Sequence, residues 1–409
     1  MVRFITNEVD SKATYAGTEA VAGTAVAPDY MWPGELNISK TANLRTDNKE
    51  ATGGYDRDVT PALEIPSYSG TYAEDLTFET LPMQLQYAVK TGAAGVAAGT
   101  DAYEYAKSPS FNVDDIDSAT LQYGVNGLAW QSTGVRHDEF TITIDADDTD
   151  GVWKFSSNLF VLNKTALPTP FDGVATGGTA TTLVMTGATW TVDEHKGKYV
   201  FLKFGSHTGQ VRQIVSNTAD TLTVDEAFSP VPAAGDVFRI EANLPGTIPI
   251  QSYEAIPTYG TQFFIDAYAD GAPITTQILD RIISFNMTVQ STRTTKRFLE
   301  NARDEFSARS GRGAREVTGQ IRVELDRRDE YVAWETLKEF GLRVHQVGSE
   351  ISTGVTHEAE IIIPRAAFST PNEDARENNM TATFPFRAYL PDTDPIFTIS
   401  AINSLATLP

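Results

Sequence analysis

The sequence predicts a mainly β protein of the α+β class: two tandem β-sandwich or β-barrel domains, each with one packed α-helix, and a small all-β domain inserted between them. Three observations support this prediction. Short segments alternate apolar and polar residues, an internal repeat relates the two ends of the chain, and a central region contains only short strand-like segments.

Composition places the chain among folded proteins. It has 409 residues, of which 41% are hydrophobic, which is enough for more than one core. It carries 54 acidic against 32 basic residues, a formal charge of -22, which disfavours wrapping around a polyanion. The chain has no cysteine, so disulfides and thiolate sites are excluded. Without an apolar leader or membrane-length apolar run, it is expected to be a soluble protein made in a reducing cytoplasm.

The chain divides into four predicted parts: an N-terminal arm (1–30), a first domain (31–168), an inserted small β domain that projects outward (169–245) and a second domain (246–409). The arm is rich in small residues without a clear pattern. It is therefore expected to order only against a partner, with a tail of no function as the alternative.

The internal repeat aligns residues 36–92 with residues 285–341 at a constant offset of 249. Identity is low, but the order of elements is shared: a short strand (ELNIS or SFNMT), a long charged loop, an extended segment (SGTYAEDLTF or TGQIRVELD) and one helix. In the second copy, the helix is expected over DEYVAWETLKEFG, ending at Gly341. In the first copy, Pro82 fits the first helical turn, and Leu85, Ala88 and Val89 are expected to face inward.

Further strands follow each helix. FTITID (140–145) and GVWKFSS (151–157) belong to the first copy, and EAEIIIP (358–364) and MTATFPFRAYL (380–390) belong to the second. Between the copies, residues 172–242 contain short strand-like segments separated by Gly, Asn-Thr and Pro-Ala-Ala-Gly turns, with no helical pattern. We expect this region to fold as a separate domain.

No motif for catalysis, a cofactor or a metal stands out. DADDTDG (145–151) resembles a calcium loop, but Asp150 and Ser156 stand where glycine and glutamate are required. The five histidines lack metal-ligand spacing, and His137 and His207 are expected to be exposed residues at strand ends. The glycine-rich segments lack the lysine of a phosphate-binding loop. The chain is therefore expected not to be an enzyme and to need no cofactor.

The two long loops of the repeat differ in charge. Residues 293–315 hold seven basic residues against three acidic ones, whereas the matching loop, residues 44–69, holds three basic against five acidic. Such complementarity suggests contacts between neighbouring copies of the chain. A solvated loop and a nucleic-acid patch are alternatives, although no base-stacking platform is evident. The candidate contact residues are Arg293, Lys296, Arg297, Arg303, Arg309, Arg312, Arg315, Asp47, Glu50, Asp56 and Asp58.

The order of elements in both copies, with GTYAEDLTFETLPMQLQYAVKTG, ATLQYGVNGLAW and DEFTITIDADDTDGVWKFSSNLF, resembles the tail tube proteins (major tail proteins) of long-tailed bacteriophages. The resemblance covers both repeat copies and is one of texture rather than of an invariant motif. The inserted region, with KGKYV, GQVRQIVSNT and PAAGD, is similar to small β modules of phage structural proteins.

The resemblance implies a structural virion protein that self-assembles into rings, whose sheets join edge to edge. The rings stack into the tail tube, the conduit for genome ejection into the host. Loops 44–69 and 293–316 and the arm would then bridge successive rings. With two tube domains in each chain, a trimer ring with pseudo-hexameric symmetry is expected, and a true hexamer is the competing arrangement.

Partners under this interpretation are the chain itself and other phage tail proteins. DNA would pass through an acidic lumen without specific binding, and no membrane is involved. The protein would be assembled in the host cytoplasm and located in the virion tail. The alternative is a β-rich adhesin or carbohydrate-binding surface protein, with Trp130, Trp153 and Trp190 as stacking residues. A hydrolase using scattered carboxylates is the least favoured hypothesis.

Overall fold

The computed structural model describes residues 13–408 except 42–43, 49–57, 64–66, 93, 111–115, 126–127, 167–170, 205–208, 242–252, 279–280, 292, 296–309, 313, 326–335, 337–338 and 377–378. It is mainly β, with antiparallel sheets and one helix among the described elements. The mainly-β prediction is therefore confirmed at the level of class. Nine of the thirteen residues of the helix expected over DEYVAWETLKEFG lie outside the described residues. Its last two, Phe340 and Gly341, begin strand β26 Phe340–Ser352, so the expectation that the helix ends at Gly341 is wrong.

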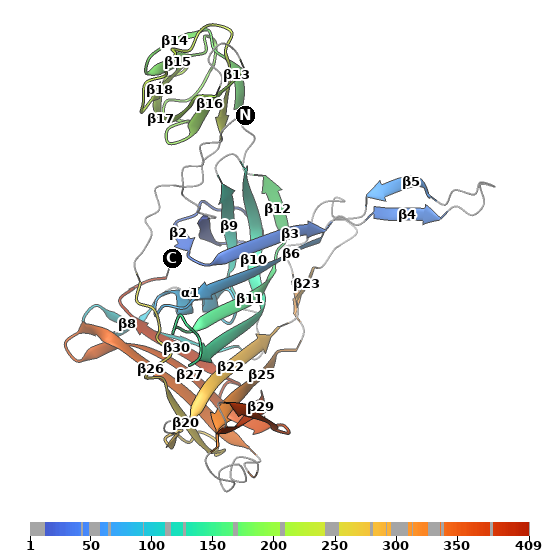
Figure 1. Cartoon of the computed structure of the whole chain (residues 1–409), viewed down its shortest axis with the longest axis vertical. Helices are drawn as coiled ribbons and strands as arrows, with labels where there is room; N and C mark the ends of the chain where they lie inside the picture. The colour runs from blue at the N-terminus through green and yellow to red at the C-terminus, as the bar shows by residue number, and fades with distance from the viewer. Residues whose placement is uncertain are drawn as a thin grey trace.

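Eight antiparallel strands form one long sheet in the order β3-β6-β11-β10-β22-β25-β29-β28 (Figure 1). Their bounds are β3 Glu35–Thr41, β6 Ser67–Asp75, β10 Leu128–Asp145, β11 Lys154–Phe160, β22 Ile282–Gln290, β25 Glu316–Glu324, β28 Asn372–Arg376 and β29 Asn379–Ala388. The strands expected from both copies of the repeat lie in this sheet, except EAEIIIP (358–364), which forms part of β27 Val355–Phe368 in another strand group. Alternating apolar residues such as Ile142 and Met287 point to its buried face.

Two further strand groups pack behind the long sheet. The first has the order β12-β10-β9-β1-β2, and the second has the order β21-β20-β26-β27-β30-β8-β7. The bounds are β1 Ala13–Glu19, β2 Tyr30–Trp32, β7 Val96–Gly99, β8 Ala102–Lys107, β9 Ser118–Val125, β12 Asn163–Ala166, β20 Gln262–Ala267, β21 Gln277–Ile278, β26 Phe340–Ser352, β27 Val355–Phe368 and β30 Thr398–Asn403. Together with the long sheet they enclose one large apolar core.

The first strands of the chain correct one expectation. Residues 13–19, placed by the sequence in an arm that orders only against a partner, form β1, which pairs with β9 over seven residues and with β2. Ala16 is fully buried there. Small residues can occupy a strand that lies close to other elements, and here a Cβ on Gly17 would lie 2.6 Å from the Ala27 carbonyl oxygen. The lack of a strong alternating pattern therefore concealed a core strand.

Strand pairing repeats along the chain. In the first half, β3 pairs with β6, β6 with β11, β11 with β10 and β10 with β9; in the second half, β22 pairs with β25, β25 with β29, β29 with β27 and β27 with β26. The registers agree as well: Ile38 lies opposite Gly70, and Met287 lies opposite Gly319, a shift of 249 for both residues. The same offset that aligned the sequences therefore aligns the hydrogen-bonded ladders.

The helix of the first half, α1 Thr80–Gln86, lies where the sequence placed it and is buried throughout. Pro82 stands in its first turn, where the missing N–H has no intrahelical partner to lose. Leu85 is buried as expected, and Ala88 and Val89 are buried in the turn after the helix ends. This helix packs against β8 and β30, so it contacts strands from both halves of the chain.

Residues 171–241 form a separate seven-stranded sheet in the order β13-β19-β16-β17-β18-β15-β14. The bounds are β13 Phe171–Val174, β14 Gly177–Thr179, β15 Thr182–Val184, β16 Tyr199–Phe204, β17 Val211–Asn217, β18 Thr221–Val224 and β19 Val237–Glu241. Within the described part of the chain these strands pair only with one another, and they enclose their own core around Leu202 and Phe238. Figure 1 shows this unit at one end of the molecule.

Candidate assembly surface

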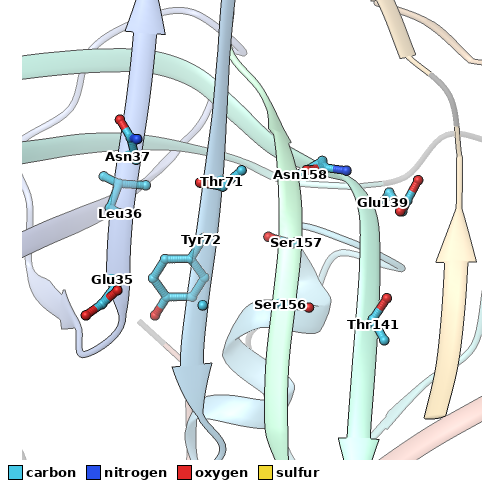
Figure 2. Close-up of a pocket in the computed structure, with 11 residues that line it drawn as sticks. Glu35, Leu36, Asn37, Thr71, Tyr72, Glu139, Thr141, Ser156, Ser157 and Asn158 are labelled. Atoms are coloured by element: carbon cyan, nitrogen blue, oxygen red, sulfur yellow. The ribbon is translucent and has the colours of Figure 1, made fainter.

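The exposed face of the long sheet is polar and hollowed in two places. One hollow lies over β3, β6, β11 and β10 and is lined by Asn37, Thr71, Thr141, Ser156 and neighbouring residues (Figure 2). A second hollow lies over β22, β25 and β29 and is lined by Asn286, Gln320, Arg387 and others. The two asparagines occupy equivalent positions in the two registers. The same kind of polar surface is therefore repeated along the sheet.

Charge on this face is unbalanced. Among the residues whose side chains the structure describes, the alternation puts these charged residues on it: Glu35, Asp75, Glu139, Asp145, Glu316, Glu324 and Asp374 against Arg136, Lys154, Arg322 and Arg387. Arg387 Nη2 lies 3.3 Å from Glu316 Oε1, and Arg322 Nη2 lies 3.6 Å from Asp374 Oδ2. Both pairs are partly exposed, so they contribute little stability, and they leave the face net acidic.

Two hairpins extend from the equivalent strands β3 and β22, one in each half. β4 Leu44–Asn48 pairs with β5 Asp58–Leu63 after β3, and β23 Arg293–Thr295 pairs with β24 Ser310–Arg312 after β22. Figure 1 shows the β4–β5 hairpin projecting away from the body, on the side where β22 leads into β23. In each of the loops expected over residues 44–69 and 293–316, a strand near the start of the loop pairs with a strand nearer its end and forms a two-stranded hairpin.

The candidate contact residues differ in where the structure places them, and Arg293 is the first residue of hairpin strand β23. Asp47, Asp58 and Arg312 lie on the hairpin strands, while Glu50, Asp56, Lys296, Arg297, Arg303 and Arg309 lie outside the described residues. Arg315 is half-buried just before β25. Arg293 is only 6% exposed, and its backbone N–H donates to Asp138 Oδ1 at 2.5 Å. Arg293 therefore belongs to the base of its hairpin, where burial keeps it away from a contact surface.

A buried polar cluster lies under the first hollow. His137 Nε2 lies 3.0 Å from Gln84 Oε1, and its Nδ1 lies 2.7 Å from Ser157 Oγ. Because the amide oxygen can only accept, Nε2–H donates to it and Nδ1 accepts from the serine, so one neutral tautomer satisfies both contacts. Burial lowers the pKa of His137 to about 3, in agreement with a neutral ring.

The expectation that His137 is exposed at a strand end is wrong: its side chain is 1% exposed and stacks on Trp32 at 5.6 Å between ring centroids. The prediction was based on the polar residues on either side of His137 in the sequence. Side chains of adjacent strand residues point to opposite faces, so polar neighbours do not imply that His137 itself is exposed. His207, to which the same expectation applied, lies outside the described residues.

Beyond Gln84 the cluster continues to a carboxyl group. Tyr72 Oη donates to Glu74 Oε2 at 2.6 Å, and Gln84 Nε2 lies 3.3 Å from Tyr72 Oη. Burial raises the pKa of Glu74 to about 8, because the charged form loses its water. The serine, the histidine and this carboxyl are all buried, and a histidine with so low a pKa accepts a proton poorly. The cluster therefore has the features of a packed polar core, in which Glu74 Oε1 has no hydrogen-bond partner among the described residues.

The acidic loop DADDTDG is a turn between β10 and the segment before β11. Lys154 Nζ lies 2.5 Å from Asp148 Oδ2 and 2.9 Å from Asp150 Oδ2, so a cation of the chain itself bridges these carboxylates. Among the described residues, no group of three or more histidine, aspartate or glutamate side chains is arranged to hold a metal ion. Nor is any described helix both long and apolar enough to cross a membrane.

The three tryptophans considered for carbohydrate stacking differ in exposure. Trp153 and Trp190 are buried in the cores of the body and of the inserted unit. Trp130 is 38% exposed, but Lys164 Nζ lies 4.9 Å from its ring centroid. A sugar stacking on that face would have to displace the ammonium group and its cation–π contact.

The sequence did not reveal the two edges of the long sheet, β3 and β28. Each pairs with a single strand among the described residues, β3 with β6 and β28 with β29. The repeat indicates that one edge of each copy must meet the other copy or remain open, but which strands form the open edges follows only from the strand pairing. In comparisons with known proteins, no protein-family model matches the chain, and no curated protein matches it.

Proposed function

We propose that this chain is a structural, non-enzymatic protein that self-assembles into rings, and that the rings stack into the tail tube of a long-tailed bacteriophage. The observation that carries the proposal is the pairing of β10 with β22, which joins two strand sets of equal pairing order edge to edge in one sheet. A chain that already joins two such units can extend the series with further copies.

In this proposal each half of the chain is a tube domain of one duplicated design, and the inserted unit projects outward. Three chains supply six tube domains, giving a trimer ring with pseudo-sixfold symmetry. The hairpins β4–β5 and β23–β24 follow equivalent strands, so each ring presents twice as many hairpins as chains to its neighbour. Their opposite charge in the sequence supports contacts from ring to ring.

The polar face of the long sheet would line the lumen. Its excess of carboxylates repels the phosphate backbone, so DNA can slide through without binding. Screening over roughly 8 Å at physiological salt restricts this effect to charges on the wall itself. The partners of the chain are then further copies of itself and other tail proteins, and its location is the virion tail after assembly in the host cytoplasm.

Negative-stain electron microscopy of the purified chain tests the proposal. The expected result is rings or tubes with a stain-filled centre. A chain that remains monomeric at high concentration, or that forms solid aggregates, would contradict it.

A further inference from the structure

The junction between the two halves provides a template for a junction between two chains. β10 and β22 pair over seven residues, from Glu139 opposite Gln290 to Asp145 opposite Ser284. β22 corresponds to β3, the open edge at one end of the long sheet, through the shared offset of 249. The other side of the β10–β22 junction is β10. If the strand at the second open edge of the long sheet is equivalent to β10, then the two open edges of the chain match the two sides of that junction.

β27 and β28 follow one another along the same side of β29 and together match the long strand β10; β28 matches the part of β10 that pairs with β22. Thr141 of β10 lies opposite Ser156, which lies opposite Ala73 in the next strand. Asn372 of β28 lies opposite Thr383, which lies opposite Arg322. Ala73 and Arg322 are themselves 249 residues apart, so the two paths across the sheet reach equivalent positions. Asn372 therefore occupies the place of Thr141.

We propose that β28 of one chain pairs antiparallel with β3 of a second copy, in the register of β10 with β22. This register places Asn372 opposite Ser39, Glu373 opposite Ile38 and Asp374 opposite Asn37 of the second copy. The proposal rests on the proposed function for its ring geometry, and it adds the strands, the register and the residues that close the ring.

Side chains at the two edges fit this register. Asn372, Glu373 and Asp374 are exposed, as are Asn37, Ser39 and Lys40, whereas the equivalent residues of the β10–β22 junction are buried or half-buried, except at the end of β22. In that junction Thr141 and Thr288 face each other with their hydroxyl oxygens 2.8 Å apart. Asn372 and Ser39 fall on the same pair of positions, and both have groups that can make the corresponding hydrogen bond.

Charge fits as well. Glu373 falls opposite Ile38 and diagonal to Lys40, a spacing at which long side chains of opposite charge interact across strands. In the β10–β22 junction the position of Glu373 is held by Ile142, which is fully buried against the core. A charged residue on this edge keeps it from pairing indiscriminately, and Lys40 supplies the partner that only the second copy offers.

Neither edge is blocked by another strand within the described residues. The Ile38 carbonyl oxygen accepts a hydrogen bond from Lys164 Nζ at 2.5 Å. A single side chain can withdraw at a much lower cost than a strand, so this contact satisfies the edge in the separate chain and leaves it available. The β8–β30 pairing is a second link that exists only between the halves of one chain, so chains should separate from each other more easily than halves do.

Disulfide trapping tests the register directly, because the chain has no cysteine of its own. Asn37→Cys chains are mixed with Asp374→Cys chains under mild oxidation and separated by non-reducing electrophoresis. Opposed residues in an antiparallel pair lie about 4.5–5.5 Å apart between Cα atoms, within disulfide range. The mixture should form a disulfide-linked dimer that neither variant forms alone. Because the two thiols start on different chains, an intramolecular bond cannot imitate this result.

The matched control is Asn37→Cys mixed with Glu373→Cys. A shift of one residue turns the second thiol to the other face of the sheet, so the linked dimer should be lost. Equal cross-linking in both mixtures would overturn the register. A second control exchanges charge: Lys40→Glu should reduce the linked dimer, and Lys40→Glu combined with Glu373→Lys should restore it.

Electron microscopy of the same samples separates this inference from the proposed function. Tubes without the Asn37–Asp374 disulfide would overturn the β28–β3 contact and leave the tube proposal standing. The linked dimer without rings or tubes would support the contact and overturn the tube. Absence of both the disulfide and any assembly would overturn both.

Discussion

Thr141 and Thr288 lie on adjacent strands from opposite halves of the chain, with their hydroxyl oxygens 2.8 Å apart. On the other face of the same junction, Ile142 lies opposite Met287, and both are fully buried. A polar pair on the exposed face and an apolar pair in the core show that the two halves share one sheet and one core. Removal of this junction should therefore affect the whole body of the protein.

Met287→Ala tests that dependence. The substitution leaves a cavity at the junction, so the free energy of unfolding should fall by about 2–5 kcal/mol. Urea denaturation followed by far-ultraviolet circular dichroism gives this value for the body of the protein. Asn37→Ala, on an exposed edge position of the same sheet, is the matched control and should change the value by less than about 0.5 kcal/mol. Equal effects of the two substitutions would contradict a shared core.

Glu74 predicts a pH dependence of stability. Burial raises the pKa of Glu74 from 4.5 to about 8, so the folded chain keeps its proton while the unfolded chain releases it. The contribution of Glu74 to the free energy of unfolding should therefore decrease as pH rises from about 4.5 to 8, with a limiting slope of about 1.4 kcal/mol per pH unit for one proton. Glu74→Gln keeps a hydrogen-bond acceptor for Tyr72 and should remove this decrease.

The measurement is a series of urea titrations between pH 4.5 and 8.5 on both proteins. The difference in unfolding free energy between Glu74→Gln and the parent chain should shift in favour of the variant as pH rises. A difference that stays constant across this range would mean that Glu74 ionises normally in the folded state. His137 acts in the opposite direction between about pH 3 and 6.5, which overlaps the range of Glu74, so the difference between the two proteins is the quantity that isolates Glu74.

The charged hairpins predict how rings stack. Arg309→Glu with Arg312→Glu reverses two charges in the basic segment, so attraction to the acidic hairpin of the next ring should weaken. Tubes should become shorter or separate into rings, as measured from tube lengths in electron micrographs. Lys196→Glu with Lys198→Glu makes the same change of charge in the inserted unit and should leave tube length unchanged. Normal tubes from the arginine variant would contradict the electrostatic account.

The inserted unit predicts a tolerated deletion. Among the described residues, the strands of residues 171–241 pair only with one another and have their own core, so replacing them with a short flexible linker breaks no described ladder in the body. The shortened chain should unfold with the same free energy for the body and should still assemble. Failure of the shortened chain to assemble, while its circular dichroism remains that of a folded β protein, would show that the unit takes part in the ring.

The strands of both halves could be predicted because residues such as Ile321 and Val323 alternate with polar neighbours, and a half-buried strand requires this alternation. The register of the repeat was also accessible, since Gly70 and Gly319 hold equivalent places opposite Ile38 and Met287. A Cβ on Gly319 would lie 2.2 Å from the Asn286 carbonyl oxygen, which explains the small residue there.

Other features were beyond prediction for physical reasons. β1 is made of small residues whose burial depends on what packs over them, so local sequence contains no signal for it. His137 is buried because its partners, Gln84 and Ser157, come from distant segments. The open edges β3 and β28 become visible only when the pairing of every other strand is known, because an edge is defined by the neighbour that it lacks.

One measurement tests the central claim most directly: electron cryo-microscopy of the assembled particle, viewed along its axis. The account predicts a closed hollow ring of three chains, each contributing two similar lobes, with the long sheets joined through β28 and β3 into one wall. A particle whose two halves lie on different radii, or whose sheets end without a neighbouring strand, would contradict it.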